Sequence, residues 1–205
     1  MRSAAILAGG RASRFGGRDK SALVVDGETI LRRQVSELRQ VRGLSGILIV
    51  GREDADRGAA ADSGIRTISD LVPGSGPLGG IHAALSEAGG DDRPAVMILA
   101  CDMPYVTAPL VSWLLDLSDD ADAVVPHTER GYHPLCAVYT RACLGAIGRR
   151  LAERRLKVVD LFDEIRTRVV TSEELDRFGD HHRLMRNVNT PADYAALDAF
   201  PSHQL

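Results

Sequence analysis

The sequence predicts an α/β protein with a three-layer, Rossmann-like architecture, in which helices cover both faces of a mainly parallel central sheet. Short apolar runs alternate along the chain with amphipathic stretches of helical length, and this alternation is typical of βαβ units. The runs at 4–7 and 95–100 are apolar at every position, as expected of strands that are buried on both faces. The 205 residues are expected to form a single domain at about 1–200.

The expected strands are short apolar segments at 4–7, 46–50, 66–68, 95–100, 123–126, 135–139 and 168–170. The expected helices cover about 29–41, 77–88, 107–117, 141–153, 172–177 and 191–198, where apolar residues recur at helical spacing. Pro77 falls in the first turn of the second helix, where its missing N–H is tolerated. Thr107 and Thr190 are expected N-caps, and Asp193 follows Thr190 at the spacing of a capping box.

The composition excludes several classes of function. A net charge of −3 gives no general attraction to nucleic acid or to anionic membranes. No apolar run approaches the roughly 18 residues of a membrane span, and the N-terminus lacks a secretory signal, so we expect a cytoplasmic protein. Cys101, Cys136 and Cys143 lie in or beside apolar segments and are expected to be buried, reduced thiols.

The first expected strand leads into a loop that combines glycines with basic side chains. Gly9 and Gly10 end the strand, and Arg14 and Lys20 follow within the next ten residues. Glycines let a backbone approach a ligand closely and present its N–H groups to phosphate oxygens, while the two cations can offset phosphate charge. Lys20 does not directly follow a glycine, so the loop is not a Walker A motif. It predicts a different cradle for a nucleoside triphosphate.

A second glycine-rich segment, 70–80, precedes the second expected helix. Gly74, Gly76 and Gly79 match the spacing G-x-G-x-x-G, but the dinucleotide fingerprint follows the first strand of a βαβ unit, and this segment follows the third. We interpret it as a loop that points a helix N-terminus at a ligand, with Gly79 and Gly80 permitting close packing. Asp70 could accept a hydrogen bond from a base or a ribose hydroxyl, or could stabilise an ordinary turn.

Asp102 is the candidate metal ligand. It follows the apolar run 95–100, and ligands of open α/β sheets bind outside the carboxyl ends of the strands. A single carboxylate there suits Mg²⁺ (Mn²⁺ is an alternative), which binds one or two carboxylates together with substrate phosphates. The competing interpretation, that Asp102 caps the next helix, is disfavoured because Thr107 is the expected cap.

Two later segments hold further polar candidates. His133 precedes an expected strand and could line the cleft or act as a structural hydrogen-bonding group. Asn187 and Asn189 flank an apolar residue, so in an extended chain they point the same way. We expect a structural or supporting role for Asn187 and a ligand contact for Asn189. His181 and His182 lie in a polar stretch and are expected to be surface residues without a metal.

Five segments together resemble the molybdenum cofactor guanylyltransferases, which make molybdopterin guanine dinucleotide. The opening pattern of that family, LAGG-x3-R-[MF]-GG-x-DK, is met at 7–20. Four further patterns occur in order: GPL-[AG]-G at 76–80, CDMP at 101–104, HP-x-x-A-[VL]-Y at 133–139 and N-[VI]-NTP at 187–191. The matches therefore span essentially the whole chain.

The resemblance implies a nucleotidyltransferase fold and the transfer of GMP from GTP to molybdenum-molybdopterin, with release of pyrophosphate. The nucleotide half would cover about 1–104 and the pterin half about 105–200. Site residues carried over from the family patterns are Leu7, Ala8 and Gly9 for backbone contacts to guanine, Arg14 and Lys20 for the phosphates, Asp70 for the nucleotide and Asp102 for Mg²⁺. The missing side chain at Gly10 leaves room for a purine, and His133 and Asn189 are our candidates for contacts with the second substrate. The family often has an asparagine just after the second strand, where this chain has Gly51.

Other functions remain open at this level. The chain could be a related nucleotidyltransferase that uses CTP or acts on a sugar phosphate, although such cytidylyltransferases tend to carry LAAG where this chain has Gly9 and Gly10. It could also be a non-catalytic GTP-binding protein that delivers the cofactor, but a pure binder would not need Asp102 and Lys20 together. Contact with apo-molybdoenzymes or their chaperones fits either activity.

Overall fold

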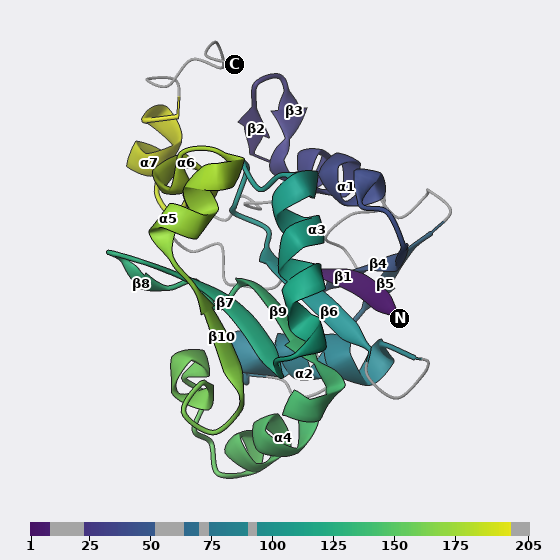
Figure 1. Cartoon of the computed structure of the whole chain (residues 1–205). Coiled ribbons are helices and arrows are strands. Elements are labelled where there is room, and N and C mark those ends of the chain that lie inside the picture. The colour runs from purple at the N-terminus through teal and green to yellow at the C-terminus, as the bar shows by residue number, and fades with distance from the viewer. Residues whose placement is uncertain (9–22, 52–63, 70–73, 90–93, 198–205) are drawn as a thin grey trace.

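The computed structural model describes residues 1–8, 23–51, 64–69, 74–89 and 94–197, which form a three-layer α/β/α arrangement (Figure 1). Within these residues an eight-stranded sheet has the order β10-β7-β9-β6-β1-β4-β5, with β8 paired to β7. The strands are β1 (Arg2–Leu7), β4 (Leu44–Val50), β5 (Ile65–Ile68), β6 (Ala95–Ala100), β7 (Ala123–Thr128), β8 (Gly131–Tyr132), β9 (Cys136–Thr140) and β10 (Thr167–Val170). A separate hairpin joins β2 (Val24–Val25) and β3 (Glu28–Thr29).

The described helices lie close to the positions that the sequence predicts, except α6, where the sequence predicts no helix. They are α1 (Ile30–Gln40), α2 (Gly76–Glu87), α3 (Ala108–Asp116), α4 (Leu144–Ala152), α5 (Ser172–Leu175), α6 (His181–Leu184) and α7 (Pro191–Ala195). Short 3-10 turns cover Leu117–Asp119, Arg141–Cys143, Val158–Leu161 and Asp176–Phe178. Among these residues no helix is long and apolar enough to cross a membrane.

The sheet is mainly parallel, as predicted, with one inserted antiparallel strand. Parallel pairs join β1 to β4 and β6, β4 to β5, and β7 to β10. β9 lies between β6 and β7 and is antiparallel to both. The chain moves outward from β1 through β4 to β5 and then returns to place β6 on the other side of β1. The sheet therefore has a topological switch point between β1 and β6, where ligands of such sheets bind.

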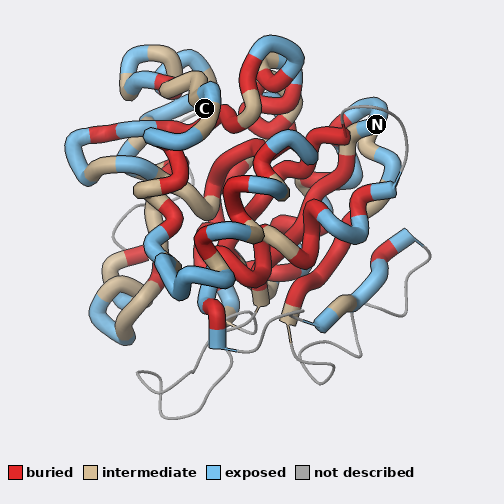
Figure 2. Tube along the Cα trace, turned by 90° about the horizontal axis from the view of Figure 1, so that it is seen from below, coloured by how far each residue is buried: buried red, intermediate tan, exposed pale blue. Residues whose placement is uncertain are grey.

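Alternating side chains of the central strands build two cores, one on each face of the sheet. Ala4 and Ile6 of β1 pack with residues of α1 and α3, whereas Ala5 and Leu7 pack with residues of α2. Figure 2 shows that the buried segments are concentrated in the middle of the molecule. Burial on both faces explains why these strands are apolar at consecutive positions instead of alternating.

The structure corrects one expected cap and confirms another. Thr190 accepts a hydrogen bond from the backbone N–H of Asp193, which bonds back in a capping box. Thr107 occupies the N-cap of α3, but its side chain makes no capping hydrogen bond. The carboxylate of Glu37 in α1 accepts instead from the backbone N–H of Ala108 at 2.7 Å. A negative charge at a helix N-terminus is favourable, so the cap of α3 also ties α3 to α1.

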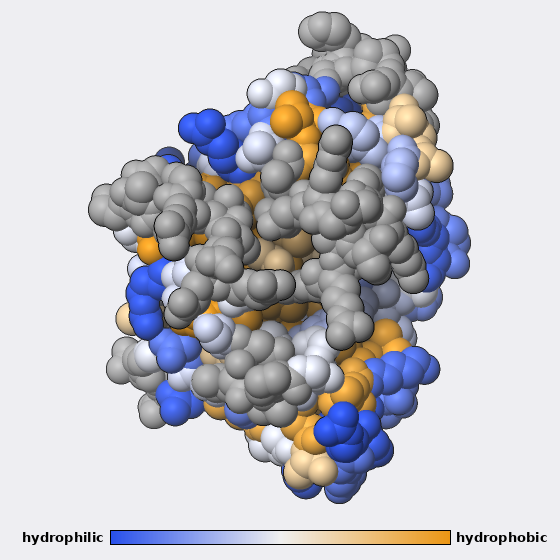
Figure 3. Space-filling view, turned by 180° about the vertical axis from the view of Figure 1, so that it is seen from behind, coloured by the Kyte–Doolittle hydropathy of each residue, from blue (hydrophilic) through white to orange (hydrophobic). Residues whose placement is uncertain are grey.

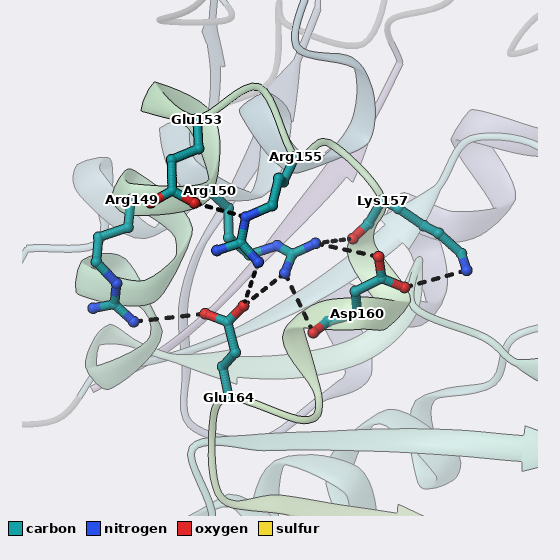
Figure 4. Close-up of polar contacts among 7 residues, drawn as sticks. All are labelled: Arg149, Arg150, Glu153, Arg155, Lys157, Asp160 and Glu164. Carbon is teal, nitrogen blue, oxygen red and sulfur yellow. Dashed lines mark hydrogen bonds and ion pairs between the residues drawn. The ribbon is translucent and has the colours of Figure 1, made fainter.

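A buried guanidinium holds the segment that follows α4. Arg150 is 1% exposed, and its Nη1 atom lies 2.7 Å from the Glu164 carboxylate. Its two terminal nitrogens also donate to the backbone carbonyls of Lys157 and Asp160. Figure 4 shows that Arg149 and Arg155 are also directed at Glu164. The hydrogen bond from Arg150 is the main cause that lowers the pKa of Glu164.

The three cysteines are free thiols, as expected. Cys136 and Cys143 are buried, and Cys101 is partly buried. Burial raises the pKa of Cys136 to about 12, so this thiol stays protonated and unreactive near neutral pH.

Candidate active site

Asp102 lies just beyond the carboxyl end of β6, at the switch point of the sheet. Its backbone position follows from the pairing of β6 with β1, because the N–H of Cys101 donates to the carbonyl of Leu7 at 3.2 Å. The residue is only 9% exposed. The strand thus delivers a carboxylate to the place where the fold binds ligands.

The turn that carries Asp102 is held by Gln34, a buried side chain of α1. The Gln34 amide donates to the carbonyls of Ala100 at 2.8 Å and Met103 at 3.0 Å. These two carbonyls belong to residues on either side of Asp102 in the sequence, so α1 holds the backbone of the turn that carries Asp102. A buried amide that satisfies two backbone carbonyls is favourable because their desolvation would otherwise cost free energy.

A segment 85 residues further along the chain holds the Asp102 side chain. The amide of Asn187 donates to Asp102 Oδ1 at 2.9 Å, and the backbone N–H of Val188 donates to the Asp102 carbonyl at 2.9 Å. The carboxylate is thereby oriented through one of its oxygens. This contact agrees with the supporting role that the sequence predicts for Asn187, although no spacing rule could identify its partner.

Leu7 and Ala8 lie at the neighbouring strand end. The N–H of Ala8 donates to the carbonyl of Val50 at 2.8 Å, so this position continues the ladder of β1. α2 packs closely here, because a side chain added at Gly80 would approach Leu7 Cδ2 to 3.2 Å. The structure therefore confirms that Gly80 permits close packing of α2 against the end of β1.

His133 lies at the same sheet edge as Asp102. The carbonyl of Leu135 accepts from the N–H of Ala100, which places 133–135 beside the end of β6. His133 Nε2 lies 2.9 Å from the Thr128 hydroxyl. Burial, reinforced by the nearby charge of Arg130, lowers the pKa of His133 below its usual value. The imidazole is therefore neutral at pH 7. It can donate one hydrogen bond and accept another, but it does not act as a cation.

Asn189 is partly buried at the start of α7. Its backbone N–H donates to Asp193 Oδ2 at 2.9 Å, and the N–H of Thr190 donates to the same oxygen at 2.8 Å. The structure thus places Asn189 two residues from the Asn187 contact with Asp102, on a segment whose backbone is fixed by the cap of α7.

Several predicted site residues lie outside the described residues: Gly9, Gly10, Arg14, Lys20 and Asp70. Gly51, which stands where the resembling family often has an asparagine, is described. Its N–H donates to the carbonyl of Ile68 at 3.0 Å, so the sheet already uses this backbone donor. Figure 3 shows described hydrophobic residues near the middle of the face opposite to that of Figure 1.

The fold and the switch-point carboxylate agree with comparisons to known proteins. The family described as "MobA-like NTP transferase domain" matches residues 4–167. The chain belongs to this family. It is therefore a nucleotidyltransferase. The matched span includes β6, Asp102 and β1 from Ala4 onward, whereas Asn187 follows it.

Relatives of this nucleotidyltransferase cover nearly its whole length. A protein of Pelotomaculum thermopropionicum named "Probable molybdenum cofactor guanylyltransferase" is 35% identical over 92% of this chain and 87% of its own length. A "Molybdenum cofactor guanylyltransferase" of Desulfosudis oleivorans is 31% identical over 95% of this chain and 93% of its own. The solved molybdopterin-guanine dinucleotide biosynthesis protein A of Archaeoglobus fulgidus superposes with a TM-score of 0.79 at 23% identity, over 97% of each chain.

The structure also corrects the expected position of one histidine of the nucleotidyltransferase. His181 is not a plain surface residue, because its side chain is only 14% exposed and contacts the carboxylates of Asp176 and Glu129. His182 is exposed, as expected, and also approaches Glu129. The sequence does contain a nearby carboxylate in Asp176, but the contribution of Glu129 arises only from the fold.

Proposed function

We propose that this nucleotidyltransferase transfers GMP from GTP to the terminal phosphate of molybdenum-molybdopterin, giving molybdopterin guanine dinucleotide and pyrophosphate. The observation that carries the proposal is the Asp102 carboxylate at the switch point, held by Asn187 at 2.9 Å. Both residues belong to the sequence patterns at 101–104 and 187–191, and full-length relatives carry the guanylyltransferase name.

We assign the nucleotide site to the sheet edge beside β1. Leu7 and Ala8 would contact the guanine through backbone groups, and their positions at the end of β1 support this role. Gly9 and Gly10 directly continue this strand end in the sequence. The remaining residues assigned to the nucleotide are Arg14, Lys20 and Asp70. The half at about 1–104 would bind the nucleotide, and the half at about 105–200 would bind the pterin.

Asp102 fits a divalent cation such as Mg²⁺ or Mn²⁺. Its oxygen donors suit a hard ion, and Asn187 orients the carboxylate in the way that outer partners orient metal ligands. When bound, the ion supplies charge neutralisation at the phosphates. The family's reaction needs no strong general base, because a phosphate nucleophile is already anionic near neutral pH. Positioning by the loop and charge compensation by Arg14 and Lys20 then account for catalysis.

We assign the second substrate to the edge formed by His133 and Asn189. His133 is neutral at pH 7 and lies beside the end of β6, so it can offer a hydrogen bond to a pterin or its phosphate. A cytoplasmic location belongs to the same proposal, and the three free thiols accord with a reducing compartment. Delivery of the product to apo-molybdoenzymes or their chaperones is the proposed next step.

The test is pyrophosphate release with molybdenum-molybdopterin and Mg²⁺, with GTP, CTP, ATP and UTP assayed in parallel. We expect release with GTP and little with the other three. Release with CTP alone would overturn the guanine assignment and keep the fold and the role of Asp102. If the protein binds GTP but releases pyrophosphate from none of the four nucleotides, the proposed function would instead be non-catalytic delivery of the cofactor. A sugar 1-phosphate in place of the pterin tests the remaining class of nucleotidyltransferase.

Asn187→Ala should raise the Mg²⁺ concentration needed for half-maximal rate and lower kcat by about 10–100-fold, because loss of an outer partner of a metal ligand has effects of this size. The measurement is the initial rate as a function of Mg²⁺ concentration. Gln40→Ala is the matched control, since Gln40 is an exposed amide that bonds within α1. An unchanged Mg²⁺ dependence in Asn187→Ala would remove Asn187 from the site.

A further inference from the structure

A second cluster of ligating side chains lies where α6 meets the turn between β7 and β8. Glu129 belongs to that turn, and His181 and His182 begin α6. One ligating atom from each of these three side chains lies within 4.8 Å of the others. Asp102 is not part of this cluster, which therefore differs from the proposed Mg²⁺ site.

The hydrogen bond of His181 with Asp176 fixes which ring nitrogen faces the cluster. Nδ1 lies 2.8 Å from Asp176 Oδ1, and an ionised carboxylate can only accept, so Nδ1 is the donor. The other ring nitrogen, Nε2, lies 3.4 Å from Glu129 Oε2. A ring nitrogen and a carboxylate oxygen at this distance can be joined by a proton on the ring or by a metal ion.

The spacing and chemistry of the cluster match a zinc site. Zinc binds histidine nitrogen and carboxylate oxygen at about 2.0–2.2 Å in tetrahedral geometry, so adjacent ligand atoms are about 3.3 Å apart. Glu129 Oε2 lies 3.4 Å from His181 Nε2, and Glu129 Oε1 lies 3.1 Å from His182 Nδ1. The bond from His181 to Asp176 is the carboxylate–histidine arrangement that supports metal-ligating histidines.

A second grouping, Asp176, Asp180 and His181, also brings ligating atoms together, but its atoms are already used. His181 Nδ1 already bonds Asp176, and Asp180 Oδ1 already accepts from the backbone N–H of His182 at 3.0 Å. Two imidazoles favour zinc over magnesium. The first grouping is therefore the better site.

We propose that Glu129, His181 and His182 bind a zinc ion that fastens α6 to the β7–β8 turn. The fourth ligand would be water. α6 ends at Leu184, and the chain reaches Asn187 three residues later. Zinc at this cluster would thus secure the segment that supplies the partner of Asp102. The site does not depend on which nucleotide or second substrate the enzyme uses.

The test is isothermal titration calorimetry, in which zinc is added to the full chain without a tag and after removal of bound metal. We expect one zinc ion per chain at this site and a rise in thermal midpoint on binding. Glu129→Gln and His182→Gln should each weaken zinc binding at least tenfold, and Asp176→Asn should weaken it about 10–100-fold. Glu129 and His182 are 52% and 63% exposed, so these variants should keep the fold, which circular dichroism checks.

His127→Gln is the matched control, because His127 is an exposed histidine on neighbouring β7 that is not in the cluster. It should bind zinc like the unaltered protein, and so should Asp102→Asn. Absence of zinc binding, or equal binding by Glu129→Gln and the unaltered protein, would overturn the proposal. Loss of binding in Asp102→Asn alone would assign the zinc to the nucleotide site and would equally overturn it.

Discussion

Asp102→Ala is expected to lower kcat for pyrophosphate release by about 10²–10³-fold or more, the effect of removing one preorganised group that stabilises developing charge. The substitution removes the carboxylate that would hold the divalent ion. It also leaves the Asn187 amide without the acceptor that lies at 2.9 Å. The measurement is kcat at saturating GTP, with Mg²⁺ varied from limiting to excess.

Asp102→Asn separates the two consequences. An asparagine keeps an oxygen that can accept from Asn187 but removes the charge. We expect its turnover to fall nearly as far as that of the alanine variant, while its thermal midpoint stays closer to that of the unaltered protein. Near-normal turnover in either variant at limiting Mg²⁺ would contradict the role of Asp102 as the metal ligand.

Arg150→Met is expected to destabilise the protein by about 3 kcal/mol, because it leaves two backbone carbonyls without their buried donor and removes one of the arginines that pair with Glu164. The side chain is 1% exposed and serves the carbonyls of Lys157 and Asp160 as well as Glu164. For a chain of this size the loss corresponds to a fall in Tm of roughly 6–12 °C. Urea unfolding and thermal melting both measure it.

The control for this prediction is Arg149→Met, which removes a neighbouring arginine of the same network. Arg149 is 62% exposed and lies 3.6 Å from Glu164, so its loss should cost less than about 1 kcal/mol. If the two variants were equally stable, burial would not make Arg150 contribute more to the free energy of unfolding than the exposed Arg149. Pyrophosphate release by folded Arg150→Met should stay near that of the unaltered protein, since Arg150 lies outside the candidate site.

The main sheet strands and longer helices could be predicted from the sequence because their apolar patterns are long enough to be unambiguous. The pairs Val24–Val25 and Glu28–Thr29 and the strand Gly131–Tyr132 are too short to show a period of two. The antiparallel orientation of β9 between β6 and β7 also could not be predicted from the sequence, because a strand that is buried on both faces is apolar whichever way it runs.

The sequence predicts the position of Asp102 directly after an apolar strand, but it does not predict the contacts of that residue. Its bond to Asn187 spans 85 residues, and that of His181 to Glu129 spans two distant segments. No local spacing encodes such contacts. The cap of α3 shows the same limit, because the sequence favours Thr107 while the fold brings Glu37 closer.

The bond between Asp102 and Asn187 has a consequence for the order in which the enzyme is made. Ribosomes synthesise chains from the amino end, so the glycine-rich loop and Asp102 emerge well before Asn187 exists. A nascent or prematurely terminated chain can therefore carry the nucleotide loop while its carboxylate lacks this partner. The contact that orients the Asp102 carboxylate therefore forms only late in translation, once the segment that carries Asn187 has been made.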